Sequence, residues 1–351
     1  MAEIVSAKGE RSAWLANGFV RSRLLLQRQG AMIVLVLLIV FAAVRYDGFL
    51  TPFNLFHLLS YNSLFGLIAL GMTFVIMTGG IDLSVGSLAA LSSVVAALIS
   101  PHGLWLTLAA CIGVGLGVGI INGCAIAWLK IPPFITTLAM LLAARGLALL
   151  LSNNASIVVD TTSDFNVLAQ NFTFGFDIFG IGSIPITVVI LIVAYAIGSI
   201  VLNFTRFGRH VLAVGGNEEA ARLMGLPVER IQFTVYIVSS ILAALAGALL
   251  AAQTFNGLPA EGVGWELTAI AAVVVGGTLL SGGMGSVLTS LVGVLLLGLI
   301  FNILNFENGR GLISITSFWQ SVIRGAFLLV VVILQSRLTR TPGKADLGRT
   351  T

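Results

Sequence analysis

Residues 56–100 read FHLLSYNSLFGLIALGMTFVIMTGGIDLSVGSLAALSSVVAALIS. Two long apolar runs flank the short break Gly79-Gly80-Ile81-Asp82. A helix needs about 20 mostly apolar residues to cross a bilayer, and each run approaches or meets that length. The stretch therefore predicts two membrane-spanning helices joined at a glycine-rich break.

The composition of the whole chain agrees with this prediction. Of its 351 residues, 58% are hydrophobic and only 9% are charged. Soluble domains average about 45–50% apolar and about 25% charged residues. These values exclude a single soluble domain, a disordered chain and a nucleic-acid binder. The apolar residues are enough for roughly nine or ten helical spans.

We predict an all-α polytopic membrane protein with about ten transmembrane helices. A second glycine-rich break, at residues 281–286, resembles the first, and paired broken helices are typical of transporter repeats. Whether each break is a turn or a re-entrant segment stays open, so eight or twelve spans remain alternatives. The expected spans are residues 30–46, 56–78, 83–100, 104–129, 134–152, 184–202, 233–255, 266–280, 287–305 and 318–335.

The basic residues predict the orientation, because cytoplasmic segments carry an excess of Lys and Arg. With the N-terminus inside, most of the 18 basic residues fall in cytoplasmic segments. Both termini are therefore expected in the cytoplasm. The expected division is a basic cytoplasmic N-terminus (1–29), a transmembrane domain (30–335) and a cytoplasmic tail (336–351).

The sequence lacks the residues that several other functions need. None of the lysines Lys8, Lys130 and Lys344 lies in a Gly-Lys-Ser/Thr phosphate-binding loop, so this chain is not expected to bind ATP by that device. No metal-ligand cluster or catalytic triad stands out, and we expect neither an enzyme nor a cofactor in this chain. If the protein moves a solute uphill, the energy is expected from another subunit.

The loop at residues 203–232 is the most polar interior segment. Within it, Gly215-Gly216 predicts a sharp turn, Asn217 a helix N-cap and Gly225 a C-cap. Between them lies a predicted helix of about two turns, whose apolar residues Ala220, Leu223 and Met224 share a face. So short a helix does not stand alone in water. It is either an interfacial linker or a docking element for a cytoplasmic partner.

Five segments resemble one family of membrane proteins. They are residues 69–87 (ALGMTFVIMTGGIDLSVGS), 130–138 (KIPPFITTL), 213–217 (AVGGN) with the nearby Gly208, the pairs Ala220-Ala221 and Met224-Gly225, and 272–283 (AVVVGGTLLSGG). The chain is similar, from about residue 55 to 335, to the permeases of ABC transporters in the sugar-importing branch, those for ribose, arabinose, xylose and galactofuranose.

The resemblance implies a permease subunit in the bacterial inner membrane that works with three kinds of partner. These are a second permease (a copy or a sister chain), a cytoplasmic ATPase that binds the ATP, and a periplasmic sugar-binding protein. The cargo would be a monosaccharide, a pentose or hexose, perhaps in furanose form. The ATPase-coupling residues implied are Gly216, Asn217, Glu218, Glu219, Ala220, Arg222, Leu223, Met224 and Gly225.

Other interpretations remain open. The nearest is a branched-chain amino-acid permease of the same superfamily. A self-sufficient secondary carrier and a membrane scaffold without transport are the others. A secondary carrier would transport without an ATPase and would not need the short helix in the 203–232 loop.

The expected translocation path is lined by polar residues within or next to the spans. Asp82 either caps the helix that follows it or gates the break. Arg145 either pairs structurally with a carbonyl or polar neighbour, or lies near the sugar. The candidate path residues are Asn62, Thr73, Thr78, Asp82, Ser84 and Arg145.

The outer loops, residues 153–183 and 256–265, are expected to meet the binding protein. They carry Asp160, Asp164, Asp177 and Glu261, so we expect a basic rim on that partner.

Overall fold

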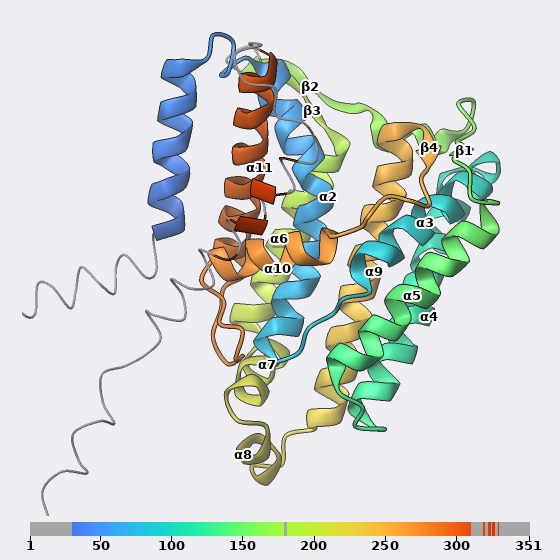
Figure 1. Ribbon diagram of the computed structural model, residues 1–351, viewed down its shortest axis with the longest axis vertical. Helices are drawn as coiled ribbons and strands as arrows, with labels where there is room; N and C mark the ends of the chain where they lie inside the picture. The colour runs from blue at the N-terminus through green and yellow to red at the C-terminus, as the bar shows by residue number, and fades with distance from the viewer. Residues whose placement is uncertain are drawn as a thin grey trace, which may run out of the picture.

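A computed structural model describes residues 30–178 and 181–309, together with residues 319, 322–323, 325–326 and 329. The expected cytoplasmic N-terminus, the tail and most of the expected span at 318–335 lie outside these residues, as does Arg324. Figure 1 shows a bundle of helices, most of them running along its long axis.

Among the described residues, seven helices are long and apolar enough to cross a membrane. The chain is therefore a mostly helical, polytopic membrane protein, as predicted. The seven are α2 (Pro52–Met77), α3 (Val85–Ile99, continued by the 3-10 turn η1, Ser100–His102), α4 (Leu104–Ala127), α5 (Pro133–Leu151), α6 (Ile186–Phe204), α9 (Val228–Thr254) and α11 (Val287–Gly309).

The remaining elements are short. A further apolar helix is described over Gly30–Arg45, and α10 (Trp265–Val275) falls below the length of a span. Between α6 and α9 lie α7 (Arg206–Gly216) and α8 (Glu218–Leu223). The connection from α5 to α6 holds η2 (Asp164–Ala169) and an antiparallel hairpin of β2 (Asn171–Ile178) and β3 (Ile181–Pro185), and β1 (Ile157–Val158) pairs with β4 (Asn256–Gly257).

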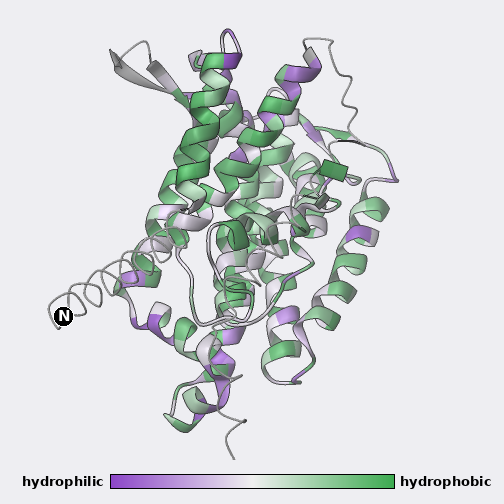
Figure 2. Ribbon diagram, turned by 60° about the vertical axis from the view of Figure 1, so that its left-hand side comes forward, coloured by the Kyte–Doolittle hydropathy of each residue, from purple (hydrophilic) through white to green (hydrophobic). Residues whose placement is uncertain are grey.

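The helices form an inner and an outer set. In the most apolar part of each helix, 83% of the α2 residues and 72% of the α9 residues are buried, against 28% for α4 and 22% for α5. Because α4 and α5 are nevertheless strongly apolar, their exposed faces suit contact with lipid. Figure 2 shows these hydrophobic helices, with hydrophilic residues gathered mainly toward the two ends of the bundle.

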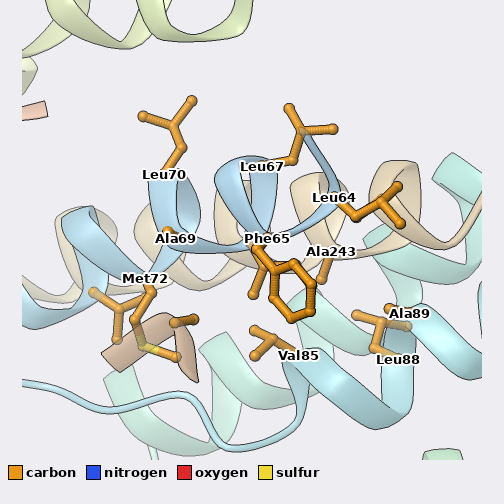
Figure 3. Close-up of a cluster of buried hydrophobic side chains, with 14 of the residues drawn as sticks. Leu64, Phe65, Leu67, Ala69, Leu70, Met72, Val85, Leu88, Ala89 and Ala243 are labelled. Carbon is orange, nitrogen blue, oxygen red and sulfur yellow. The ribbon is translucent and has the colours of Figure 1, made fainter. Parts of the chain in front are cut away.

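The core lies where α2, α3 and α9 meet. Figure 3 shows Phe65 and Met72 of α2 in one cluster with Val85 and Leu88 of α3 and Ala243 of α9. Small residues let the neighbouring helix α4 approach α9 closely. A Cβ on Gly119 would lie 2.7 Å from the Cα of Ile237, a distance that no real side chain tolerates. Such close backbone packing is usual between membrane helices.

The prediction of a full span at residues 266–280 is wrong, because the helix found there is too short. Helix α10 ends at Val275, and its 11 residues extend about 16 Å, which does not cross a hydrocarbon core of about 30 Å. Gly276 caps it, and Gly277 has φ +90°, a conformation that favours glycine. In Figure 1, α10 lies crosswise at about half the height of α2.

The loop expected at residues 203–232 is mostly helical. Gly215-Gly216 does not form the expected turn, since both residues belong to the last turn of α7. Helix α9 begins at Val228, five residues before the expected start at 233. The short helix expected after Asn217 is present as α8.

Candidate functional site

The short helices α7 and α8 project from one end of the bundle (Figure 1). Asn217 joins them. It ends α7, and its side-chain Oδ1 accepts a hydrogen bond from the amide of Ala220 at 2.8 Å, so it caps α8 as expected. The C-cap of α8 is Met224, one residue before the predicted Gly225, and Gly225 follows with φ +78°, a left-handed conformation that turns the chain toward α9.

Ion pairs fasten α8 to the helices behind it. The Arg222 guanidinium binds Glu218 at 3.1 Å within α8 and Glu229 at 2.5 Å on α9. Lys130, in the turn between α4 and α5, reaches the same Glu229 carboxylate at 3.2 Å. The hydrogen bonds to Glu229 and Glu218 raise the pKa of Arg222 above its usual value. Exposed pairs contribute little stability singly, but this network fixes the orientation of α8.

The tip of α8 is apolar and exposed. Leu223 is 85% exposed and Met224 is 70% exposed. Ala220 is half-buried, and the residue that packs inward is Ala221. The predicted apolar face thus exists, and its two largest members point away from the rest of the described chain. A rigid helix that offers exposed Leu and Met is suited to bind another protein.

The backbone behind α7 touches both glycine-rich breaks. The amide of Gly283 donates to the carbonyl oxygen of Met77 at 3.0 Å. Gly215 lies against the same two residues, because a Cβ there would overlap the Met77 carbonyl and lie 2.6 Å from the Gly283 nitrogen. A Cβ on Gly282 would lie 2.8 Å from the Gly79 nitrogen. We call this contact of Met77, Gly79, Gly215, Gly282 and Gly283 the glycine junction.

Asp82 is fully buried and holds the first break in place. Its Oδ1 accepts hydrogen bonds from the Ser84 amide at 3.0 Å and the Ser84 hydroxyl at 2.6 Å. Its Oδ2 accepts from the Ser239 hydroxyl of α9 at 2.9 Å, and Asn122 of α4 donates to the Ser84 oxygen at 3.1 Å. Ser84, not Asp82, stands at the N-cap of α3. The carboxylate therefore ties the break to two helices.

Arg145 of α5 binds backbone oxygens near the opposite end. Its Nη1 donates to the carbonyls of Pro259 and Glu261, in the segment that leads into α10. In the same segment, Gly262 packs so tightly on Gly86 of α3 that a Cβ on either residue would overlap the other backbone. These contacts correspond to the structural pairing considered for Arg145.

The six expected path residues do not meet in one place. Asp82 and Ser84 share a cluster, and Arg145 lies apart from it. Thr73 donates to the Ala69 carbonyl of its own helix at 2.6 Å. Thr78 and Asn62 line two different cavities.

The cavity next to Thr78 has a volume of about 240 Å³ and lies beside α8. It is lined by Thr78, Gly79, Gly80, Ile126, Lys130, Ile131, Pro132, Pro133, Glu218, Gln232 and Tyr236. Sequence reasoning missed Tyr236, whose buried hydroxyl has no hydrogen-bond partner among the described residues. A tyrosine within an apolar run gives no signal of such a position. This cavity connects the first break with α8.

The opposite end carries a broad groove of about 820 Å³ between the start of α4 and the η2 segment. Trp105, 81% exposed, and Asp164 are among its lining residues. Thr162 donates to Asp160 through both its amide and its hydroxyl, and this lowers the pKa of the Asp160 carboxyl below its usual value. The Asp160 carboxyl therefore stays ionised in mildly acidic solution. Within the described residues no group of three or more His, Cys, Asp or Glu could hold a metal ion.

Comparison with known proteins places this architecture among transporters. Residues 54–332 match the family described as branched-chain amino acid transport system / permease component. The chain is 39% identical over 317 residues to the ribose import permease protein of Bacillus subtilis (strain 168), covering 89% of this chain and 94% of that protein. It is 36% identical over 306 residues to the L-arabinose transport system permease protein of Escherichia coli (strain K12), covering 87% and 89%. An inner membrane ABC transporter permease protein of the same organism is 38% identical over 313 residues, covering 87% and 90%.

Proposed function

Since this chain belongs to the family of ABC-importer permease components that includes sugar permeases, we propose that it forms the membrane path for a monosaccharide and is driven by a separate ATPase. It is a multi-pass transport protein of the inner membrane and not an enzyme. Its relatives import ribose and L-arabinose, which favours a pentose or a hexose over the branched-chain amino acid of the family's description.

We assign the α7–α8 end to the cytoplasm. Segments between successive spans alternate between the two sides of the membrane. The segments that contain Lys130, Arg206, Arg209, Arg222 and Arg230 all fall on the same side, and an excess of basic residues is typical of the cytoplasmic side. Both termini are then cytoplasmic and the chain makes about ten passages, with α10 completing its passage through the segment that leads to Gly283. The 30–335 segment is the permease domain between two cytoplasmic ends.

The observation that carries the proposal is the pairing of an exposed α8 with the glycine junction. An ATPase that binds Leu223 and Met224 would move α8 when it changes conformation. Because Arg222 of α8 is paired with Glu229, the start of α9 would move with it. The Gly215 backbone lies against Met77 and Gly283, so α7 cannot shift without displacing both breaks. Residues 216–220 and 222–225 thus form the proposed contact with the ATPase, which binds the ATP. This chain itself needs no cofactor.

The groove between the start of α4 and η2, which we call the outer groove, is the proposed docking site for a soluble binding protein. Its acidic residues, with Asp164 in the groove and Asp160 beside it, favour a partner with a basic rim. From there the solute would pass along the α2 and α3 region, where Asn62, Thr73, Thr78, Asp82 and Ser84 lie, while Arg145 holds the outer segment that precedes α10. A second permease, a copy or a sister chain, would complete the path.

The test is to separate ATP hydrolysis from uptake. Leu223→Ala, in membranes that also contain the ATPase and the binding protein, is expected to lower sugar uptake strongly while the permease remains inserted. Leu150→Ala is the matched control, because Leu150 is 71% exposed at the far end of α5. Equal uptake by both variants, or uptake by the wild type without any ATPase, would contradict the proposal and favour a secondary carrier.

A further inference from the structure

A cavity of about 110 Å³ lies between α2, α10 and α11, apart from the Asp82 cluster and the glycine junction. We propose that it is a subsite that binds the hydroxyl-bearing edge of a monosaccharide during passage, an inference that rests on the proposed sugar-import function. Such a volume holds several water molecules, the room that a few sugar hydroxyls require. Its walls include Tyr61, Asn62, Phe65, Thr268, Gly298 and Asn305.

Asn62 supplies the first polar group. Its side chain is only 4% exposed, and its Nδ2 donates to the Leu58 carbonyl of the same helix at 2.7 Å. Asn62 lines the cavity, and its Oδ1 can accept a hydrogen bond there from a ligand hydroxyl or a water molecule.

Gly298 of α11 makes room for this amide. A Cβ on Gly298 would overlap both the Oδ1 and the Nδ2 of Asn62. Glycine weakens a helix interior because it adds backbone freedom to the unfolded chain. Its presence here is explained by the amide that it admits.

Thr268 places a second oxygen on the opposite wall. Its hydroxyl donates to the Gly264 carbonyl at 3.2 Å, which leaves its lone pairs to accept a hydrogen bond. Asn305 adds an amide from α11. Sugar hydroxyls both donate and accept, so neutral amides and a threonine from three helices form a suitable set of partners.

Aromatic rings form the apolar side of the cavity. Phe65 and Tyr61 line the cavity with their ring centroids 5.5 Å apart, and the Trp265 ring packs behind Phe65 at 4.8 Å. Small-molecule sites typically combine apolar and aromatic walls with a few placed polar groups. The C–H face of a sugar ring can rest on such a surface while its hydroxyls reach the amides.

The lining also separates ligand classes. Among the described residues that line the cavity there is no Asp, Glu, Lys or Arg. A branched-chain amino acid would bury an ammonium and a carboxylate here without charged partners, at a large cost. A neutral polyol carries no such charge.

The position of the cavity is also suitable for a transported solute. Helix α10 is short and interrupted and lies at mid-height, and transporter sites are commonly found at such helices (Figure 1).

The first test compares two isosteric substitutions. Thr268→Val removes a hydroxyl from the cavity, and Thr107→Val removes one from α4. Both hydroxyls donate to a glycine carbonyl four residues earlier, Gly264 and Gly103. The permease is reconstituted with its ATPase and binding protein, and uptake of labelled D-ribose and L-arabinose is measured beside ATP hydrolysis and thermal stability.

Thr268→Val is expected to lower uptake of the transported sugar about three- to tenfold, as for one lost hydrogen bond, while ATP hydrolysis and thermal stability match Thr107→Val. Equal uptake by the two variants would overturn the subsite. So would a parallel loss of uptake and thermal stability in Thr268→Val, since that result indicates a packing role only.

The second test needs no partner protein. Asn62→Cys in membrane vesicles is treated with a membrane-permeant thiol reagent, with and without D-ribose or L-arabinose at millimolar concentration. Asn62→Ala serves as the background for Cys111 and Cys124, which are free. Slower labelling of Asn62→Cys in sugar is expected, and an unchanged rate with the sugar that the wild type transports would contradict the subsite. If the reconstituted wild type of the first test takes up no pentose or hexose, it is the proposed function that fails and not the subsite.

Discussion

The amide of Gly283 donates a hydrogen bond of 3.0 Å to the carbonyl oxygen of Met77. Met77 ends α2, and Gly283 lies in the break after α10, so this bond joins two interrupted segments that are far apart in sequence. The Gly215 backbone of α7 lies against both residues. One small contact therefore connects the helix pair α7–α8 with each of the two breaks.

Gly215→Ala is expected to push α7 away from Met77 and Gly283. The added methyl would overlap the Met77 carbonyl and lie 2.6 Å from the Gly283 nitrogen, so the backbone must shift. We expect the variant to lose about 1–3 kcal/mol of stability, as for other overpacked sites, and to lose most of its uptake per ATP hydrolysed. Thermal unfolding and reconstituted uptake measure the two effects.

Gly117→Ala is the matched control for this prediction. Gly117 also lies within a helix, α4, and a Cβ there would meet nothing within 4 Å. Its uptake and melting temperature should stay near the wild-type values. If the two alanine variants behave alike, close packing at Gly215 does not transmit the movement of α7.

Asp82→Asn is expected to weaken the first break while keeping its shape. The Asp82 carboxylate accepts bonds from the Ser84 amide, the Ser84 hydroxyl and the Ser239 hydroxyl. An amide has one acceptor oxygen, so at least one buried donor would lose its partner, at about 1–3 kcal/mol. A lower melting temperature in detergent is the expected result. Asp164→Asn, on the exposed η2 segment, should leave it unchanged, and an equal shift in both would argue against a structural role for Asp82.

Local signals in the sequence predicted α8 well and α7 poorly. Asn217 and Gly225 act through their own backbone neighbours, so their roles at the ends of α8 could be predicted from residue type and spacing. Gly215-Gly216 carries the same kind of signal for a turn, yet these residues are helical. At Gly215 the absence of a side chain serves a contact with Met77 and Gly283, which no local pattern records.

The remaining differences also depend on contacts between distant segments. The apolar residues 266–280 fitted a full span, but helix α10 stops at Val275. The partners of Arg145 are the backbone carbonyls of Pro259 and Glu261, and any residue type could have supplied them. The sequence predicts Asn62 as a path residue, whereas its proximity to Phe65 and Thr268 follows only from the packing of α10 on α2. The proposed roles of the path residues remain predictions.

Arg145→Met is expected to loosen the segment that precedes α10. The guanidinium bonds to the Pro259 and Glu261 carbonyls would be lost, and the segment's backbone would exchange its amide hydrogens faster. Hydrogen exchange followed by mass spectrometry measures this at residues 258–264. Arg145→Lys keeps the charge and a donor, so it should restore part of the protection. Unchanged exchange in Arg145→Met would mean that the Gly262–Gly86 packing alone holds the segment.

Docking of the binding protein is expected to weaken as salt concentration rises. The outer groove is flanked by Asp160 and contains Asp164, and charges on an exposed surface are screened beyond about 8 Å at physiological ionic strength. Association rates, measured by surface plasmon resonance on nanodiscs, should therefore fall several-fold between low and physiological salt. Because the pKa of Asp160 is lowered by its bonds to Thr162, the attraction should persist when the pH falls to mildly acidic values. Asp164→Asn should reduce the salt dependence, whereas Glu218→Gln, at the opposite end of the molecule, should not. Docking that is insensitive to salt would exclude a basic rim on the partner.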